Sequence, residues 1–256
     1  MKLVRFHNGG TIRAGKLDAD RINELQGDLL YDLVETDQFR SRSALRLAAP
    51  CQPGKVVGLA INYPGATGRS QDMTEPLVFL KPATSVIGPE DVIHCPFEDA
   101  QVWGETELAV VIGRTLRNAS IAQAKASIFG YAIANDVSAE NIHGWDHHLA
   151  RSKGIDTFCV IGPWIDSDYD PANRTIESLQ NGELLRQGNT DDRLWKEPEL
   201  LSWLSSWMTL EAGDVILTGA PTRVRDRLYL HEGDVFTCRI TGLGELNNQF
   251  SSKART

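Results

Sequence analysis

The segment GETELAVVIG, residues 104–113, places two carboxylates at the start of an otherwise apolar run. The apolar residues 108–112 predict a buried strand. Glu105 and Glu107 are two positions apart, so on a strand their side chains point to the same face. Burying two unpaired carboxylates side by side costs several kcal/mol or raises their pKa. We therefore expect a cationic group close to both.

The overall composition is that of a globular protein. The chain has 256 residues, 41% hydrophobic and 23% charged, a length that suits one large domain or a large domain with a small appendage. Its net charge of -8 argues against non-specific binding to nucleic acid or to an anionic membrane. We expect no nucleic-acid partner and no membrane partner.

Targeting segments and cysteine usage bear on the cellular compartment in which the protein is expected. The N-terminal residues lack an apolar signal-peptide core, and no apolar run approaches the roughly 18 residues of a membrane span. The four cysteines (Cys51, Cys95, Cys159, Cys238) are far apart and form no C-x-x-C pair. This pattern favours reduced thiols in a cytoplasmic protein.

Turn residues and strand-like runs divide the chain. Residues 1–48 carry Gly and Asp every few positions and predict a small N-terminal β domain. The stretch LAAPCQPGK, residues 47–55, is typical of a linker, and residues 49–256 form the predicted second and larger domain. Short apolar runs such as KVVGLAINY, ELAVVIG and GDVILTG predict a strand-rich second part. The fold class is therefore α+β and rich in β.

Two helices are expected among these strands. Ser120 and Gln123 match a capping box at the start of a helix over 120–129, with Gly130 as its stop. Pro198 suits the first turn of a second helix over about 198–209. Apolar residues recur at helical spacing along this second helix and predict a core-facing stripe: Leu200, Leu201, Leu204, Trp207 and Met208.

A third acid joins the first two. Asp136 lies at the C-terminal end of the predicted strand in FGYAIANDVSAEN. Three carboxylates without a nearby Cys or His favour Mg²⁺, Mn²⁺ or Ca²⁺ over Zn²⁺. Spacing alone leaves open that these acids are exposed strand-end residues paired with Lys or Arg.

Further motifs make the chain resemble a known family. From Val56 to Asn248 the order and spacing of its motifs are those of the fumarylacetoacetate hydrolase family, and it is most similar to bacterial members of the 2-hydroxyhepta-2,4-diene-1,7-dioate isomerase and acylpyruvase kind. The stretches that carry the resemblance are GLAINY, PLVFLKPATSVIGP, GETELAVVIGRTLRNAS, GYAIANDVSAE, KGIDTFCVIGPW, GDVILTGAP and GLGELNN.

The resemblance implies a mixed β-roll, usually dimeric, in which Glu105, Glu107 and Asp136 hold Mg²⁺ or Mn²⁺. Family members act on 2-oxo or diketo acids. A metal Lewis acid stabilises the enolate that forms in C–C cleavage, decarboxylation and tautomerisation alike. The implied metal therefore indicates a reaction type and a small 2-oxo-acid substrate, without fixing the product.

The same resemblance implies roles for individual side chains. Lys153 falls where the family places a lysine facing the substrate oxygens, so Lys153 and Glu107 are the expected catalytic residues. Lys81 either lines the site or is a structural lysine at a strand end. Tyr63 either approaches the substrate or belongs to the core.

This sequence departs from the hydrolase members at the segment after Tyr63. Ala66 stands where their water-activating His belongs, and Arg69 where their Glu belongs. Loss of a general base costs hydrolysis roughly 10²–10⁴-fold. Substitute bases are conceivable at Glu75 or at His147 or His148 in the HGWDHHLARSK loop.

Later motifs also differ. Glu140 replaces the family's Arg, and Ala220 replaces the usual Thr. Arg223 and Arg225 replace glycines, where they either bind a second substrate carboxylate or form a surface turn. Ala220 and Arg223 are expected substrate-binding residues.

Three functional hypotheses remain from the sequence. The first is a metal-dependent lyase or isomerase, such as a decarboxylase, that works through an enolate of a 2-oxo acid. The second is an acylpyruvate-type C–C hydrolase that uses a substitute base. The third is a catalytically degenerate family member that binds ligand without turnover.

Overall fold

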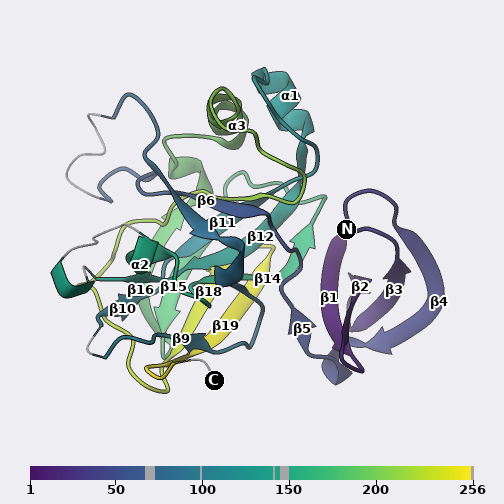
Figure 1. Ribbon diagram of the computed structural model, residues 1–256, viewed down its shortest axis with the longest axis horizontal. Helices are drawn as coiled ribbons and strands as arrows, with labels where there is room; N and C mark the ends of the chain where they lie inside the picture. Colours follow the sequence, from purple (N-terminus) through teal and green to yellow (C-terminus); the bar gives the residue numbers. More distant parts are fainter. Residues whose placement is uncertain (67–72, 99, 141, 145–149, 255–256) are drawn as a thin grey trace.

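Residues 104–113 lie at the centre of the largest sheet in the computed structural model (Figure 1). The structure describes residues 1–66, 73–98, 100–140, 142–144 and 150–254. Strand β11 (Thr106–Ile112) pairs antiparallel with β12 (Ile128–Asp136) on one side and with β17 (Val215–Leu217) on the other. All seven side chains of β11 are buried. The expected buried strand is confirmed.

The large sheet continues in both directions and mixes strand directions. Its order is β4-β3-β2-β1-β14-β12-β11-β17-β6-β7. Strand β17 runs parallel to β6, whereas its pairing with β11 is antiparallel. The strands on either side of this centre are β14 (Cys159–Asp166), β6 (Lys55–Leu59), β7 (Val78–Pro82) and the short β8 (Val86–Ile87), which pairs with β14.

A second sheet packs on one face of β11 and β12. Its order is β16-β15-β18-β19-β9, and β15 and β18 contact β11 and β12. Its strands are β9 (Ile93–His94), β15 (Thr175–Gln180), β16 (Glu183–Asn189), β18 (Val235–Ile240) and β19 (Gly244–Ser251), while β10 (Val102–Trp103) pairs with β13 (Ser138–Ala139). The main hydrophobic core lies between the two sheets.

The N-terminal strands form an antiparallel meander at one side of the molecule (Figure 1). They are β1 (Lys2–Asn8), β2 (Thr11–Asp18), β3 (Arg21–Gln26) and β4 (Val34–Ser41), followed by β5 (Leu47–Ala48), which pairs with β1. Strand β1 also pairs with β14, with Leu3 opposite Ile165, so hydrogen bonds join the meander to the large sheet. The boundary predicted at residue 48 stays a prediction.

The helices are shorter than the sequence predicts. Helix α1 (Ile121–Ala126) has the expected capping box, with Ser120 as N-cap. The predicted end near residue 129 and the stop at Gly130 are wrong, because β12 begins at Ile128 and Gly130 pairs with Val111 inside it. A Cβ at Gly130 would lie 2.7 Å from the carbonyl oxygen of Asp166, so glycine permits a close approach of strands there.

Helix α3 (Glu197–Ser205) has Pro198 in its first turn, as expected. Leu200, Leu201 and Leu204 are buried, but the helix ends before Trp207, which is 53% exposed. The predicted stripe is therefore wrong at Trp207. Helices α1 and α3 lie side by side (Figure 1). The remaining helical segments are α2 (Ala150–Lys153) and the 3-10 turns Arg42–Ala44, Ala83–Ser85, Ile142–Gly144 and Thr190–Asp192.

These elements confirm the predicted class, a β-rich α+β fold built as a mixed β-roll. In the described part of the chain, no helix has the length and apolar character needed to cross a membrane. All four cysteines are buried and free.

Candidate active site

The pairing of β11 with β12 brings the three predicted metal-binding acids together. Thr106 lies opposite Asn135, which places Glu105 beside Asp136. The backbone N–H of Asp136 donates to the carbonyl oxygen of Glu105 (2.9 Å), and the N–H of Glu105 donates to Oδ1 of Asn135 (2.9 Å). One carboxylate oxygen from each of Glu105, Glu107 and Asp136 lies within 4.8 Å of the others.

Thr106, between the two glutamates, points to the opposite face, as strand alternation requires. Its Oγ1 accepts a hydrogen bond from Oγ of Ser178 on β15 (2.8 Å), and its N–H donates to the same hydroxyl (3.1 Å). This contact fixes the start of β11 on the second sheet and leaves Glu105 and Glu107 on the other face.

Two lysines bind the third acid. Nζ of Lys153 donates to Asp136 and to Oγ of Ser138 (2.6 Å), and it lies 3.9 Å from Glu105. Nζ of Lys81 donates to the other oxygen of Asp136 and to the carbonyl of Val137 (2.9 Å). Burial by itself would raise the pKa of Asp136, but the two ammonium groups outweigh it and lower that pKa. Asp136 is therefore a carboxylate in this structure.

Glu107 is different because it has no lysine or arginine partner in the part of the chain that the structure describes. It is 1% exposed and accepts a hydrogen bond from the backbone N–H of Gly219. Among the described residues it forms no ion pair with Lys or Arg. Burial, together with Asp136 and Glu105, raises its pKa well above the usual value. A cation close to all three acids would relieve this cost.

A hard divalent cation fits these residues. The donors are all carboxylate oxygens, the preference of Mg²⁺, Mn²⁺ and Ca²⁺. Oxygens on opposite sides of Mg²⁺ are about 4 Å apart, since Mg–O bonds are about 2.0–2.1 Å long, and the carboxylates here already lie within 4.8 Å. The buried, unpaired Glu107 supports the same conclusion. Two of the three acids, Glu107 and Asp136, are buried, against the alternative of exposed strand-end acids.

A small cavity opens next to these acids. Its volume is about 220 Å³. It is lined by Leu59, Ala60, Ile61, Ala66, Leu77, Trp103, Glu105, Asp136, Lys153, Arg186, Ala220, Arg223 and Arg227. The expected residues Lys153, Ala220 and Arg223 thus share one cavity with two of the acids.

Two other expected residues lie behind this cavity. Lys81 is fully buried and reaches Asp136 from the protein interior. Tyr63 is 2% exposed, its hydroxyl has no hydrogen-bond partner among the residues that the structure describes, and burial raises its pKa. It packs near Gly188 and is not among the residues that line the cavity. The preceding Asn62 ties the segment to Trp195 and Thr218 through side-chain hydrogen bonds.

The other described candidates from the altered motifs are not among the residues that line the cavity. Arg225 pairs with the exposed Glu183, and Glu75 is exposed. Glu140 accepts a hydrogen bond from Arg227 (2.9 Å). Arg69, His147 and His148 fall outside the described residues.

Among the lining residues that were not expected from the sequence, three are charged or aromatic. Arg186 on β16 donates to Glu105 and to the carbonyl oxygen of Pro221 (2.7 Å). The guanidinium of Arg227 lies 4.0 Å from the ring centroid of Trp103. The sequence offers a clue for Trp103: it precedes Glu105 by two positions, the spacing that puts two side chains of an extended segment on the same side. The Asn181-Gly182 pair, both with positive φ, indicates the β15–β16 hairpin that carries Arg186, but not the residue that Arg186 contacts.

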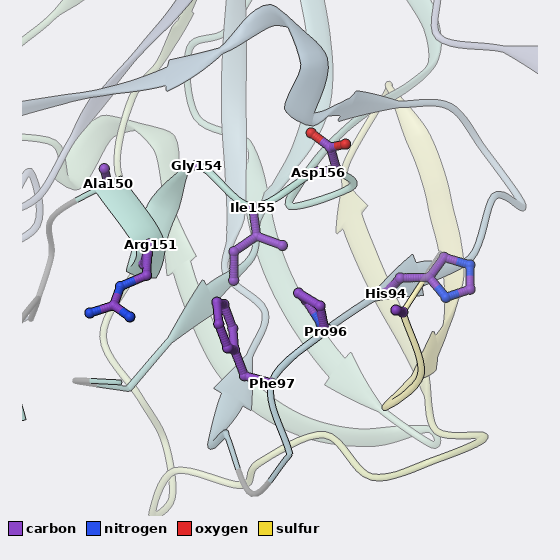
Figure 2. Close-up of a pocket in the computed structure, with 9 residues that line it drawn as sticks. His94, Pro96, Phe97, Ala150, Arg151, Gly154, Ile155 and Asp156 are labelled. Atoms are coloured by element: carbon purple, nitrogen blue, oxygen red, sulfur yellow. The ribbon is translucent and has the colours of Figure 1, made fainter. Parts of the chain in front are cut away.

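A larger pocket, about 520 Å³, lies beside α2 (Figure 2). Phe97 and Ile155 point into it, and Arg151 and Asp156 lie at its sides. Of the predicted site residues that the structure describes, none lines this pocket. The smaller cavity, where charged groups converge, is therefore the candidate active site.

The fold is thus a mixed β-roll in which three carboxylates that could hold a divalent metal lie beside a small charged cavity. The chain belongs to the fumarylacetoacetate hydrolase family: residues 55–251 match the family described as Fumarylacetoacetate (FAA) hydrolase C-terminal. Residues 1–50 match the family described as Rv2993c-like, N-terminal. The family resemblance seen in the sequence is confirmed.

Relatives of the chain carry enzyme names. The chain is 37% identical over 226 residues to "Oxaloacetate tautomerase FAHD2B, mitochondrial" of Bos taurus, covering 81% of this chain and 70% of the bovine one. The structure of 5-carboxymethyl-2-hydroxymuconate delta-isomerase from Mycobacterium smegmatis matches with a TM-score of 0.89 and 34% identity, covering 99% and 100% of the two chains. The prediction that the chain is an enzyme is confirmed.

A further solved structure bears on the metal. Maleylpyruvate hydrolase from Sphingobium sp. SYK-6, in complex with manganese(II) and pyruvate, matches with a TM-score of 0.82 and 26% identity, covering 99% of this chain and 100% of that chain. This neighbour contains a divalent metal, and in the present chain an acidic trio is available for one.

Proposed function

We propose that the protein is a Mg²⁺- or Mn²⁺-dependent enzyme that acts on a 2-oxo or diketo acid or its enol. Enol–keto isomerisation, decarboxylation or related C–C cleavage is favoured over hydrolysis. The observation that carries the proposal is the trio of Glu105 and the buried Glu107 and Asp136, next to a cavity that Lys153 lines; among the described residues Glu107 has no cationic partner. The tautomerase and isomerase names of relatives support the same reaction type.

The metal, when bound, would polarise the substrate carbonyl as a Lewis acid and so favour the enolate. Lys153 supplies a fixed positive charge at the same place. Burial by itself would lower its pKa, but Asp136 and Glu105 outweigh this and raise it, so the ammonium group stays protonated near neutral pH. A buried ammonium group that already points at the cavity can stabilise negative charge on a substrate oxygen without reorganisation.

Neighbouring residues fix the positions of Lys153 and Glu105 and limit the access of water to the cavity. Asp136 and Ser138 fix Nζ of Lys153, and Arg186 fixes Glu105. Leu59, Ile61 and Leu77 form an apolar side of the cavity. In such surroundings electrostatic interactions are stronger than in bulk water.

The preference against hydrolysis rests on Ala66. It lines the cavity where the hydrolase members carry a water-activating His. Among the described residues that line the cavity there is no histidine. A reaction that needs no activated water suits these residues better.

The test is product analysis in isotopically labelled water. The protein would be incubated with Mg²⁺ or Mn²⁺ and with oxaloacetate, an acylpyruvate and a 2-hydroxydienedioate, in H₂¹⁸O and separately in D₂O. We expect chelator-sensitive enol–keto conversion, with deuterium entering carbon, or loss of CO₂. No ¹⁸O should enter a new carboxylic acid. ¹⁸O in such a product would contradict this and support the acylpyruvate-type hydrolase, the second candidate, which the maleylpyruvate hydrolase neighbour favours.

Two variants sharpen the test. Glu107→Gln should abolish the metal-dependent activity, whereas Glu245→Gln, on the far β19 strand, should leave it unchanged. If no substrate turns over with either metal, the ligand-binding hypothesis replaces this one. We also propose a homodimer, as the family resemblance implies, and light scattering coupled to size exclusion would measure its mass.

A further inference from the structure

The cavity contains more positive than negative charge. Four cationic side chains line it (Lys153, Arg186, Arg223 and Arg227) against two carboxylates, Glu105 and Asp136. The whole chain has a net charge of -8, so this local excess is opposite in sign to the rest of the protein. A divalent metal would add to the excess. A cavity of this kind selects anions.

The ion pairs show which cationic side chain accounts for the excess of positive charge in the cavity. Lys153 pairs with Asp136, Arg186 with Glu105, and Arg227 with Glu140. In the part of the chain that the structure describes, Arg223 has neither a salt bridge nor a side-chain hydrogen bond. Burial and the nearby Arg227 and Arg186 lower its pKa by more than Glu105 and Asp226 raise it.

Arg227 lies beside Arg223, and not all of its N–H donors have a hydrogen-bond partner among the described residues. Its Nη1 donates to Glu140 (2.9 Å), while its buried Nε has no partner among the described residues. Stacking on Trp103, 4.0 Å from the ring centroid, holds the guanidinium in one plane. Arg227 is thus a rigid donor that supports Arg223.

The segment after β17 presents these two arginines by its pairing with β16. The N–H of Val224 donates to the carbonyl of Leu185 (2.9 Å), and Arg223 forms a β-bridge with Arg186. Arg225 instead pairs with Glu183 outside the cavity. The sequence suggests Arg223 and Arg225 as carboxylate ligands; the structure brings Arg227 to the cavity in place of Arg225.

We propose that Arg223, supported by Arg227, binds a second carboxylate of the substrate, at the end opposite the 2-oxo-acid group. The protein would then select short dicarboxylic 2-oxo acids over monocarboxylic ones of equal length. This inference rests on the proposed 2-oxo-acid function and adds the residues that set its specificity. A guanidinium suits the site because its planar donors match a carboxylate.

The test compares ligands that differ only in the second carboxylate. Three matched pairs of probes are oxaloacetate with 2-oxobutyrate, 2-oxoglutarate with 2-oxovalerate, and 2-oxoadipate with 2-oxohexanoate. Calorimetry on the Mg²⁺-loaded protein would give the dissociation constants. A hydrogen-bonded charged pair is worth about 10- to 100-fold in affinity, and we expect a preference of this size for the diacid at one or more lengths.

Two arginine variants make a matched comparison. Arg223→Gln should remove the preference and leave the affinity for the monocarboxylic acid unchanged. Arg225→Gln, with the same change of charge two residues away, should keep the preference. Circular dichroism and the thermal midpoint would verify that both variants fold as the wild type does.

The outcomes separate this proposal from the proposed function. Equal wild-type binding of diacid and monoacid, or a preference that survives Arg223→Gln, would overturn the arginine proposal alone. A preference that Arg223→Gln abolishes would support it even if the labelled-water experiment found no isomerase or lyase activity. A protein that binds no 2-oxo acid of any length would contradict both.

Discussion

Lys153 and Asp136 form a buried ion pair at the cavity wall, and Lys81 approaches the same carboxylate from the interior. The two lysines differ in their access to substrate. Lys153 lines the cavity, whereas Lys81 is completely buried. Asp136 therefore pairs with one lysine that faces the cavity, Lys153, and with a second lysine in the protein interior, Lys81.

This difference predicts opposite results for two matched substitutions. Lys153→Met should lower kcat by about 10²–10³-fold, because it removes a preorganised charge at a substrate oxygen. Lys81→Met should keep kcat within about tenfold of the wild type, since Lys81 does not line the cavity. It should instead lower the free energy of unfolding by about 1–3 kcal/mol through loss of its hydrogen bonds. Steady-state kinetics and urea unfolding would measure both; equal losses of kcat would contradict the assignment.

Glu107 predicts an unusual gain of stability. Glu107→Gln removes a buried charge that has no cationic partner among the described residues and two acidic neighbours. In the presence of chelator the variant should be more stable than the wild type, by about 1 kcal/mol. Glu245→Gln, at a strand edge with an exposed partner, should change stability by less than about 0.5 kcal/mol. A less stable Glu107→Gln protein would show that Glu107 has a stabilising partner in the metal-free state.

The backbone of Gly219 holds Glu107 through a hydrogen bond that depends on the conformation of the glycine. Its φ of +85° is in the left-handed region, a Cβ there would lie 2.8 Å from Cβ of Asn62, and its N–H binds Glu107. Gly219→Ala should therefore weaken Mn²⁺ binding about 10- to 100-fold, as loss of a ligand's hydrogen-bond partner does. Isothermal titration calorimetry would measure it.

Gly182→Ala is the matched control for that substitution. Gly182 has nearly the same φ, +83°, but a Cβ there would meet nothing within 4 Å. The Gly182→Ala variant should lose stability because alanine also disfavours the left-handed conformation, and it should bind Mn²⁺ as the wild type does. Equal Mn²⁺ affinity in both variants would show that the Gly219 hydrogen bond does not support the site.

The buried cysteines predict a pH effect on reactivity and stability. Burial raises the pKa of Cys51 and of Cys238 from 9.0 to about 12. Because the thiolate is the reactive form, a disulfide reagent at pH 8 should modify the native protein only at the rate of unfolding. These thiols take up more protons when folded, so their contribution to stability is complete below pH 9 and is lost as pH rises toward 12. Rapid labelling of all four thiols without denaturant would contradict the burial.

The sequence predicts what is local in this fold. The apolar run after Glu107 and the two-residue spacing of the glutamates are enough to place β11 and the orientation of both acids. The capping box of α1 is also local, and it is present. Helix ends were less predictable: Gly130 has the residue type of a helix stop, but its role depends on a neighbouring strand 36 positions away, at Asp166.

Contacts between distant segments were not predictable in this way. Gly219 meets Glu107 only because β17 pairs with β11, and Arg186 meets Glu105 only because the second sheet packs on the first. Periodicity shows which face a side chain takes but not what lies opposite. The expected role of Lys153 came from the family resemblance rather than from spacing.

The most direct test of the metal site is anomalous diffraction from crystals of the protein grown or soaked with Mn²⁺. We expect one strong manganese peak bonded to oxygens of Glu105, Glu107 and Asp136, absent in the Glu107→Gln variant. A peak bonded elsewhere, or three carboxylates that remain without a metal at saturating Mn²⁺, would contradict it.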